Sequence, residues 1–296
     1  MPTRAIDAIP DSPGIPISEW VYVNTALVWV TEREVEAQYL NTPYRMEEQI
    51  IAWLVRNGEI CVKAGGKTAI ARAGEWIFPG TKSGRQLMQP GTAILSMRFV
   101  AGWPTGRTLF DHGEMVVLKA SLERRLTKAA EKLEALARRA SGRKGFYEIH
   151  QSRATMLSYF AIRRAFEDWL SAYVHMMLRT GHQPTLMRSA DRRVLQAARL
   201  MDGHSLRQPF PESELALKAG LSVSQLNRLF LRDLGTSPKN YLERRRLQEA
   251  ALLLRHYKRS VKETAYELGF SSLPHFSAWF RRKEGVSPRA YQKQTG

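Results

Sequence analysis

One pattern occurs twice near the end of the chain, and it limits the possible folds more than any other feature. The first copy, "AGLSVSQLNRLFLRDLGTSPKNY", spans 219–241, and the second, "GFSSLPHFSAWFRRKEGVSPRAY", spans 269–291. Two copies are too few for a solenoid, so they predict a tandem pair of small modules. The matched pairs are Gly220 and Gly269, Leu226 and Phe276, Phe230 and Phe280, Gly235 and Gly285, Pro238 and Pro288, and Tyr241 and Tyr291.

Each copy has the pattern of a helix, a tight turn and a second helix. In the first copy Gly220 supplies the permissive backbone that ends a helix, and Ser222 can cap the next one. Leu226, Leu229 and Phe230 then recur at intervals of three and four, as residues do along one buried helix face. Two short helices joined by a glycine-containing turn make a helix-turn-helix unit, although an ordinary helical hairpin has the same pattern.

The segment between the copies predicts a rigid helix. Pro238 suits a first helical turn, and an apolar stripe follows it. The 18 residues from Lys239 to His256 would span about 27 Å at ~1.5 Å per residue. With its flanking turns, such a rod would hold two recognition helices roughly 34 Å apart, about one turn of DNA. We therefore expect one chain to reach two successive major grooves.

The net charge of +17 is unevenly distributed along the chain. Acidic and basic residues balance over 1–112, whereas basic residues are in excess over 113–188 and still more over 189–296. A merely well-solvated surface would not segregate charge in this way, so a polyanion is the expected partner of the C-terminal end. Together with the duplicated unit, the charge predicts nucleic-acid binding.

The rest of the chain predicts an α+β protein. Short β-branched and aromatic runs lie between glycine turns in the first third, and Asn57-Gly58 and Gly65-Gly66 are typical of hairpins. Helical patterns follow at 115–140 and 150–178. The expected segments are a flexible arm at 1–19, a β-barrel domain at 20–112, a helical dimerisation segment at 113–180, a linker at 181–188, and an all-α domain at 189–296.

Several function classes are disfavoured. Cys61 is the one cysteine, so neither a disulfide framework nor a cysteine-rich zinc site is expected. Residues 1–110 contain no histidine, which argues against a metal-dependent enzyme of the barrel type. No phosphate-binding glycine loop or catalytic triad is evident, and we expect neither cofactor nor metal. With no secretion signal and no membrane-spanning apolar run, a cytoplasmic protein is expected.

The last hundred residues resemble the DNA-binding domain of the AraC/XylS family of bacterial transcription regulators. The resemblance lies in "AGLSVSQLNRLF", the linking "SPKNYLERRRLQEAALLL", and "ETAYELGFSSLPHFSAWFRRKEGVSPRAY". The front half is more weakly similar, in order and texture, to the cupin-type regulatory domain that many such proteins carry. The resemblance implies a cupin-like β-barrel and dimerising helices, followed by two helix-turn-helix units on a linking helix.

In the first unit, the resemblance places base contacts on Ser224, Gln225, Asn227 and Arg228. The chemistry agrees, because Arg can bind guanine through two hydrogen bonds and Gln or Asn can bind adenine in the same way. A phosphate contact is the alternative role for Arg228.

The second unit departs from the family pattern. Pro274 and Ala278 stand where Ser224 and Arg228 stand in the first unit, and neither side chain can donate a hydrogen bond. His275 and Ser277 are the remaining polar candidates for base contacts. We therefore expect the first unit to carry most sequence readout and the second to position the domain on phosphates. The expected phosphate contacts are Arg281, Arg282 and Lys239.

The arginine run of the linking helix is expected to be divided in role. The resemblance implies that Arg246 packs within the domain, and Arg244 and Arg245 are expected on a solvated face.

Effector-binding candidates in the β domain are aromatic or basic side chains. Aromatic faces stack on sugar rings and an arginine can orient a polar ligand, although such tryptophans are more often core residues. The candidates are Trp29, Trp53, Trp76, Arg45 and Arg98.

These observations predict a transcription regulator, more often an activator in families like this, that binds double-stranded DNA and a small-molecule effector. A sugar is one candidate effector, RNA polymerase and a second copy of the chain are the expected protein partners, and no membrane is expected. The alternatives are a cupin-fold enzyme with an accessory DNA-binding tail and a DNA binder without an effector.

Overall fold

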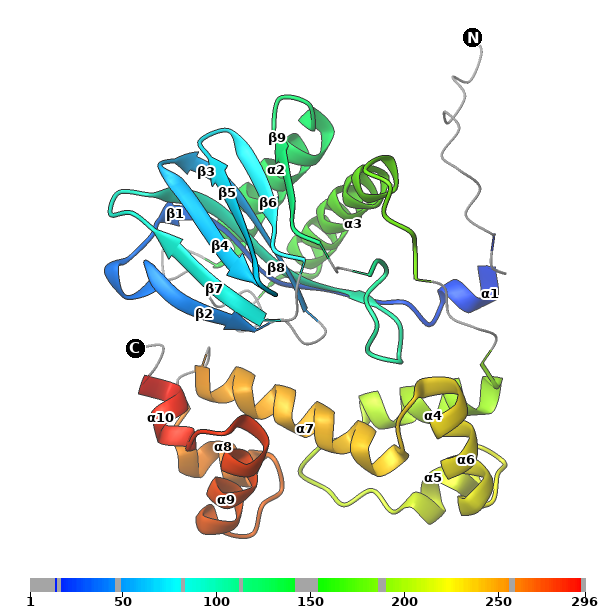
Figure 1. Ribbon diagram of the computed structural model, residues 1–296. Coiled ribbons are helices and arrows are strands. Elements are labelled where there is room, and N and C mark those ends of the chain that lie inside the picture. Colours follow the sequence, from blue (N-terminus) through cyan, green and yellow to red (C-terminus); the bar gives the residue numbers. More distant parts are fainter. Residues whose placement is uncertain are drawn as a thin grey trace. The chain divides into compact units, whose positions relative to one another are not determined.

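The computed structural model describes residues 14, 17–45, 49–80, 83–111, 114–141, 154–185, 190–255 and 259–293, and Figure 1 shows their elements. The chain divides into two compact units, residues 1–186 and 187–296. Most of the predicted arm at 1–19, the last three residues of the linker at 181–188 and the start of the helix expected at 150–178 lie outside the described residues.

The described strands of the first unit form two antiparallel sheets rather than one closed barrel (Figure 1). The expectation of a cupin-like barrel is therefore corrected to a pair of sheets, while antiparallel strands followed by helices agree with the α+β prediction. The five-stranded sheet has the order β1 (Asn24–Glu34), β8 (Ala93–Gly102), β3 (Gln49–Asn57), β6 (Glu75–Phe78) and β9 (Val116–Lys119). The four-stranded sheet has the order β2 (Asn41–Arg45), β7 (Ser83–Met88), β4 (Glu59–Ala64) and β5 (Lys67–Arg72).

One of the two expected hairpins is present. Gly65 and Gly66 both have positive φ and join β4 to its antiparallel partner β5. Asn57-Gly58 instead joins β3 to β4, which belong to different sheets. Gly58 has φ +75°, and a Cβ there would lie 2.7 Å from the hydroxyl oxygen of Thr92, the residue before β8, so glycine suits this position for both reasons.

A hydrophobic core fills the space between the sheets. Alternate residues of β3 face it, and the intervening ones face the opposite side, which is also buried. Strands that bury both faces read as continuous apolar runs, as "QIIAWLV" does. The core cluster draws on both sheets and contains Val35, Tyr44, Ile51, Trp53, Val55, Ile60, Val62, Ala64, Ala71, Ile77, Met88 and Ile94.

Two helices cover the opposite face of the five-stranded sheet: α2 (Arg124–Ser141) and α3 (Met156–Arg179). Phe99 of β8 meets Trp169 and Tyr173 of α3 edge to face, at ring-centroid distances of 4.7 and 5.3 Å. Complete burial raises the pKa of Tyr173. The indole of Trp76 on β6 donates to the Thr127 hydroxyl of α2 at 3.0 Å.

The first of these helices begins later than predicted. Residues expected in a helix from 115 form β9, in which Leu118 pairs with Trp76 of β6, and α2 starts at Arg124. Pairing with the open edge of the sheet, at β6, stabilises this segment as a strand in spite of its helical pattern.

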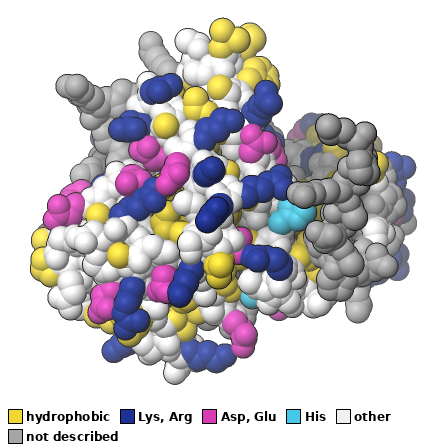
Figure 2. Space-filling view, turned by 90° about the horizontal axis from the view of Figure 1, so that it is seen from above, with side chains coloured by type: hydrophobic (Ala, Val, Ile, Leu, Met, Phe, Trp, Pro, Cys, Tyr) yellow, Lys and Arg dark blue, Asp and Glu magenta, His cyan; other side chains and the backbone are white. Residues whose placement is uncertain are grey.

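On the face in Figure 2, Lys and Arg side chains are interspersed with Asp and Glu rather than gathered in one patch.

The second unit is entirely helical over its described residues, as predicted. Two pairs of short helices have the helix-turn-helix arrangement, α5 with α6 and α8 with α9, and the long α7 links them (Figure 1). Its helices are α4 (Arg192–Gly203), α5 (Glu212–Lys218), α6 (Val223–Leu234), α7 (Pro238–Arg255), α8 (Val261–Glu267), α9 (Leu273–Glu284) and α10 (Pro288–Lys293). The remaining short helices are α1 (Ile17–Trp20) and a 3-10 turn at Ala37–Tyr39.

No helix of the described part of the chain is both long and apolar enough to cross a bilayer.

Candidate nucleic-acid interface

The two helix-turn-helix units have the same caps at equivalent places. Gly220 (φ +65°) and Gly269 (φ +78°) lie in the two turns, and Ser222 and Ser272 cap α6 and α9. Both helices end in a left-handed glycine, at Gly235 and Gly285 (φ +65° and +78°). A side chain is strained in this conformation, which explains why glycine recurs at the same interval in the sequence.

The outward face of α6 carries most of the predicted base contacts of the first helix-turn-helix unit. Ser224, Gln225 and Arg228 are exposed, whereas Asn227 is half-buried. Leu226, Leu229 and Phe230 are buried against the rest of the unit, as predicted.

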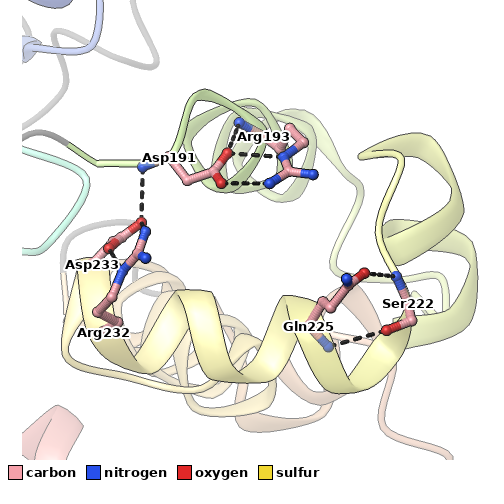
Figure 3. Close-up of polar contacts among 6 residues, drawn as sticks. All are labelled: Asp191, Arg193, Ser222, Gln225, Arg232 and Asp233. Carbon is pink, nitrogen blue, oxygen red and sulfur yellow. Dashed lines mark hydrogen bonds and ion pairs between the residues drawn. The ribbon is translucent and has the colours of Figure 1, made fainter.

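Two of the four candidates already use part of their hydrogen-bonding capacity within the protein. The side-chain oxygen Oε1 of Gln225 accepts from the backbone N–H of Ser222 at 3.0 Å, and the backbone N–H of Gln225 donates to Ser222 Oγ at 3.2 Å. These two hydrogen bonds form a capping box (Figure 3). Asn227 Nδ2 donates to Glu212 Oε2 of α5 at 2.8 Å and to the Val223 carbonyl at 3.1 Å. Bidentate recognition of adenine uses both the carbonyl oxygen and the NH2 group of the side-chain amide. Ser224 and Arg228 are therefore the candidates on α6 best placed to read bases.

The corresponding face of α9 is less polar. Pro274, His275 and Ala278 are exposed and Ser277 is half-buried. The imidazole of His275 packs edge to face on Phe270 with ring centroids 5.4 Å apart. Arg281 and Arg282 are exposed near the end of α9, and Lys239 is exposed in the first turn of α7. Basic side chains in exposed positions of this kind suit phosphate contacts.

The arginine run of α7 differs in part from expectation. Arg245 is not on a solvated face: its Nη1 donates to the carbonyl oxygens of Met201 and His204 at the end of α4, at 2.5 and 2.7 Å. A cation at a helix C-terminus satisfies carbonyls that have no intrahelical partner. Arg246 pairs with Glu243 at 2.9 Å and lies over the Phe270 ring, so the prediction that it packs within the domain is confirmed. The Arg244 guanidinium stacks on Tyr241 at 5.2 Å.

A second polar junction, which the sequence did not point out, joins α4 to α6 (Figure 3). The buried carboxylate of Asp233 accepts from the Asp191 backbone N–H at 2.8 Å and from Arg232. Burial alone would raise the pKa of Asp233, but these hydrogen bonds outweigh it and hold the pKa below its usual value. Two hydrogen bonds from the Arg193 guanidinium lower the pKa of Asp191 to about 2.

In the N-terminal unit, residues 1–186, three of the five effector candidates face the space between the sheets. Trp29 pairs with Arg98 across β1 and β8, and the guanidinium of Arg98 lies 5.0 Å from the centroid of the Trp29 ring. Trp53 belongs to the core cluster on the same side. Trp76 lies instead on the helix-covered side, where it contacts α2. Arg45 ends β2, and its side chain lies outside the described residues.

Among the residues that the structure describes, no group of three or more His, Cys, Asp or Glu side chains is suited to hold a metal ion.

The comparisons with known proteins match mainly the second unit. Residues 215–294 match a family profile described as "Helix-turn-helix domain". The HTH-type transcriptional activator RhaS of Escherichia coli O139:H28 is 44% identical over 75 residues, which are 25% of this chain and 27% of RhaS. The chain thus aligns with about a quarter of the length of these curated relatives.

Solved structures of regulators are also similar. A transcriptional regulator with an AraC-type DNA-binding domain from Chromobacterium violaceum is 33% identical, over 36% of this chain and 93% of that chain, with a TM-score of 0.33. Apo ToxT from Vibrio cholerae is 10% identical, over 93% of this chain and 98% of that chain, with a TM-score of 0.48. Because both TM-scores are low, the C-terminal unit is classified from its sequence and not from these structures.

Two helix-turn-helix units in tandem, joined by one helix, define a class of DNA-binding fold. By sequence, this C-terminal unit is a helix-turn-helix domain, and it is similar to the matching quarter of the transcriptional activator RhaS. The curated relatives that this unit matches are transcription regulators.

The Asp191–Arg193 contact predicts a specific response to acid. Because the pKa of Asp191 is lowered to about 2, its contribution to stability is complete above the pKa of an unfolded aspartate, about 3.9, and is lost as pH falls through about 2. Urea unfolding should show that Asp191→Asn destabilises the second unit at pH 7 and that the difference from wild type shrinks towards pH 2. The exposed Glu267→Gln serves as the control; a difference that stayed constant with pH would contradict the assignment.

Proposed function

We propose that the protein is a sequence-specific, double-stranded-DNA-binding transcription regulator. The observation that supports this best is the repetition of one capped helix-turn-helix design on the two sides of α7, with α6 and α9 each exposing side chains along one face. At 18 residues α7 is about 27 Å long at ~1.5 Å per residue, which suits recognition helices that enter successive major grooves.

The two recognition helices would have different tasks. On α6, Ser224 and Arg228 would read base edges, while Gln225 and Asn227 would do so only to the extent that their structural contacts leave them available. On α9, His275 and Ser277 are the polar groups nearest to a base-reading position. Arg281, Arg282 and Lys239 would bind phosphates, which fixes the position of the domain without reading sequence.

Two substitutions distinguish these tasks. Arg228→Ala should cost about 1–3 kcal/mol of binding free energy and relax preference at one base position. Arg282→Ala should weaken binding to all sequences alike and lower the slope of log K against log salt by about one unit. The sites would first be selected by the full-length protein from a random DNA pool, and affinities then measured at several salt concentrations.

The matched control is Arg125→Ala, an exposed arginine of α2 in the first unit, which should change neither quantity. If the wild-type protein enriched no sequence, or bound every duplex without salt dependence, the proposed function would be wrong. If Arg282→Ala rather than Arg228→Ala relaxed one base position, the assignment of tasks would be reversed.

We further propose that a small molecule binds the first unit and changes how the second unit occupies DNA. Trp29, Trp53 and Arg98 support this, because they place aromatic faces and a cation on the inner side of one sheet. Sugars and small carboxylates both suit such a group of side chains. An equilibrium between two arrangements, shifted by differential affinity, would connect the two units.

A thermal-shift screen of the full-length protein tests this effector. A compound present at about 100 times its dissociation constant should stabilise the protein by about 2.7 kcal/mol. Arg98→Gln should reduce the shift given by a carboxylate, whereas Arg85→Gln, an exposed position on β7, should retain it. If no sugar or carboxylate raised the melting temperature, the alternative of a DNA binder without an effector would be favoured.

A homodimer is also proposed, on the basis of apolar side chains at the start of α3. Met156, Leu157 and Phe160 are 76%, 84% and 61% exposed, and a second copy would remove them from water. Leu157→Lys should therefore shift sedimentation of the full-length protein towards the monomer. The control Leu217→Lys changes an equally exposed leucine of α5 and should leave the dimer intact; a wild-type protein that sedimented as a monomer would refute the dimer.

The regulatory direction that we propose is activation through contact with RNA polymerase, in the cytoplasm. The support is that the RhaS relatives are described as transcriptional activators. Transcription from a promoter that carries the selected site should rise when the full-length protein is added to purified RNA polymerase. A fall in transcript would instead indicate repression.

A further inference from the structure

A loop from the first helix-turn-helix half of the second unit is built into the core of the other half. Leu206, in the loop between α4 and α5, is only 9% exposed and belongs to the core cluster that contains Phe270, Phe276 and Trp279. Figure 1 shows this loop passing α7 before the chain returns to α5. The residues around Leu206 in this cluster come from α7, α8 and α9, and they lie about 45 to 75 positions later in the sequence.

The backbone of the same loop contacts the turn of the second helix-turn-helix unit. Gly269 has φ +78°, and a Cβ there would lie 2.8 Å from the Leu206 carbonyl oxygen and 3.0 Å from that of Arg207. The equivalent glycine of the first unit, Gly220, would meet nothing within 4 Å. The close approach is therefore a property of this contact and not of the repeated turn.

The first turns of α7 contact the first helix-turn-helix half. Tyr241 Oη donates to Asp202 Oδ1 of α4 at 2.9 Å, and its ring meets Phe230 of α6 edge to face at 6.1 Å. One turn further along, Arg245 donates to the two carbonyls at the end of α4, directly before the loop. Together these contacts fix α4 and α6 to one side of α7.

The same turn of α7 holds the second half. The Glu243 carboxylate accepts from the indole N–H of Trp279 on α9 at 2.7 Å and from Arg246 at 2.9 Å. Arg246 in turn lies over Phe270, 5.8 Å from the ring centroid. Residues 241–246 thus contact both α6 and α9 within about two turns of helix.

We infer that the loop at 204–208 and residues 241–246 of α7 set the spacing and rotation between the two recognition helices, and thereby the spacing of the two half-sites that the protein accepts. This inference rests on the proposed function. One base pair inserted between half-sites moves them apart by about 3.4 Å and rotates one by roughly 35°. Two units joined by α7 alone could adjust at the turns at its ends, whereas two units fixed to each other cannot.

Leu206 and Arg245 are therefore positioning residues that need not touch DNA. With the selected site in hand, the half-site read by α6 is the one whose base preference Arg228→Ala relaxes. Affinity would then be measured for DNA in which one base pair is added or removed between the half-sites, and for DNA with the α6 half-site alone. The full-length wild type should lose affinity roughly tenfold for each change of spacing, a loss like that of one mismatched base pair.

Leu206→Ala should flatten this dependence to about threefold or less and leave affinity for the α6 half-site alone unchanged. Leu206→Met, which conserves volume, should keep the wild-type dependence, and Leu217→Ala is the control at an exposed leucine. Arg245→Gln, which leaves the core filled, should flatten the dependence as well and serves if Leu206→Ala does not fold.

Three results would overturn the inference or its basis. A wild type that accepts all spacings equally would overturn the inference alone. So would a folded Leu206→Ala or Arg245→Gln protein that discriminates spacing as sharply as wild type. A wild type that selects no DNA would instead refute the proposed function, and the inference with it.

Discussion

Tyr241 and Glu243 lie within one turn of α7, and each fixes a different helix-turn-helix unit to it: Tyr241 through Phe230 and Asp202, Glu243 through Trp279. The positions of both recognition helices depend on this pair of contacts. A carboxylate that accepts from an indole and a guanidinium in a half-buried position makes stronger, more directional bonds than surface ion pairs do. Trp279 belongs to the apolar core of the second helix-turn-helix half, and Leu206 connects the loop after α4 directly to that core without passing through α7.

The duplicated unit has diverged on the face that would meet DNA, while its interior and its caps are preserved. α6 exposes Arg228 where α9 exposes Ala278, yet both helices bury a phenylalanine at the equivalent position and both end in a left-handed glycine. Packing constrains the interior of each copy in the same way, whereas the outer face is limited only by what it contacts. This difference is the basis of the proposal that α6 reads bases and that α9 anchors the domain on phosphates.

In the first unit, the side of the sheet decides the role of an aromatic residue. Trp53 and Trp76 lie on neighbouring strands and are both buried, but one faces the space between the sheets and the other the helices. Strand alternation would have separated them if the register had been known, since successive side chains face opposite sides. The register depends on pairing between strands far apart in the sequence, so the five effector candidates could not be sorted beforehand.

The sequence alone determined the features that depend on a few consecutive residues or on repetition. The glycine turns, the Ser222 cap, the buried faces of α6 and α9, and the length of α7 follow from local backbone preference and helical periodicity. The tertiary structure decided what depends on distant partners: the two sheets in place of a barrel, Asn57-Gly58 as a crossing between sheets, and β9 where a helix was predicted. It also turned Arg245 from a solvated side chain into an anchor for α4 and gave Gln225 a capping role. These outcomes require knowing which carbonyls and strand edges lack partners, and only the assembled chain shows which ones do.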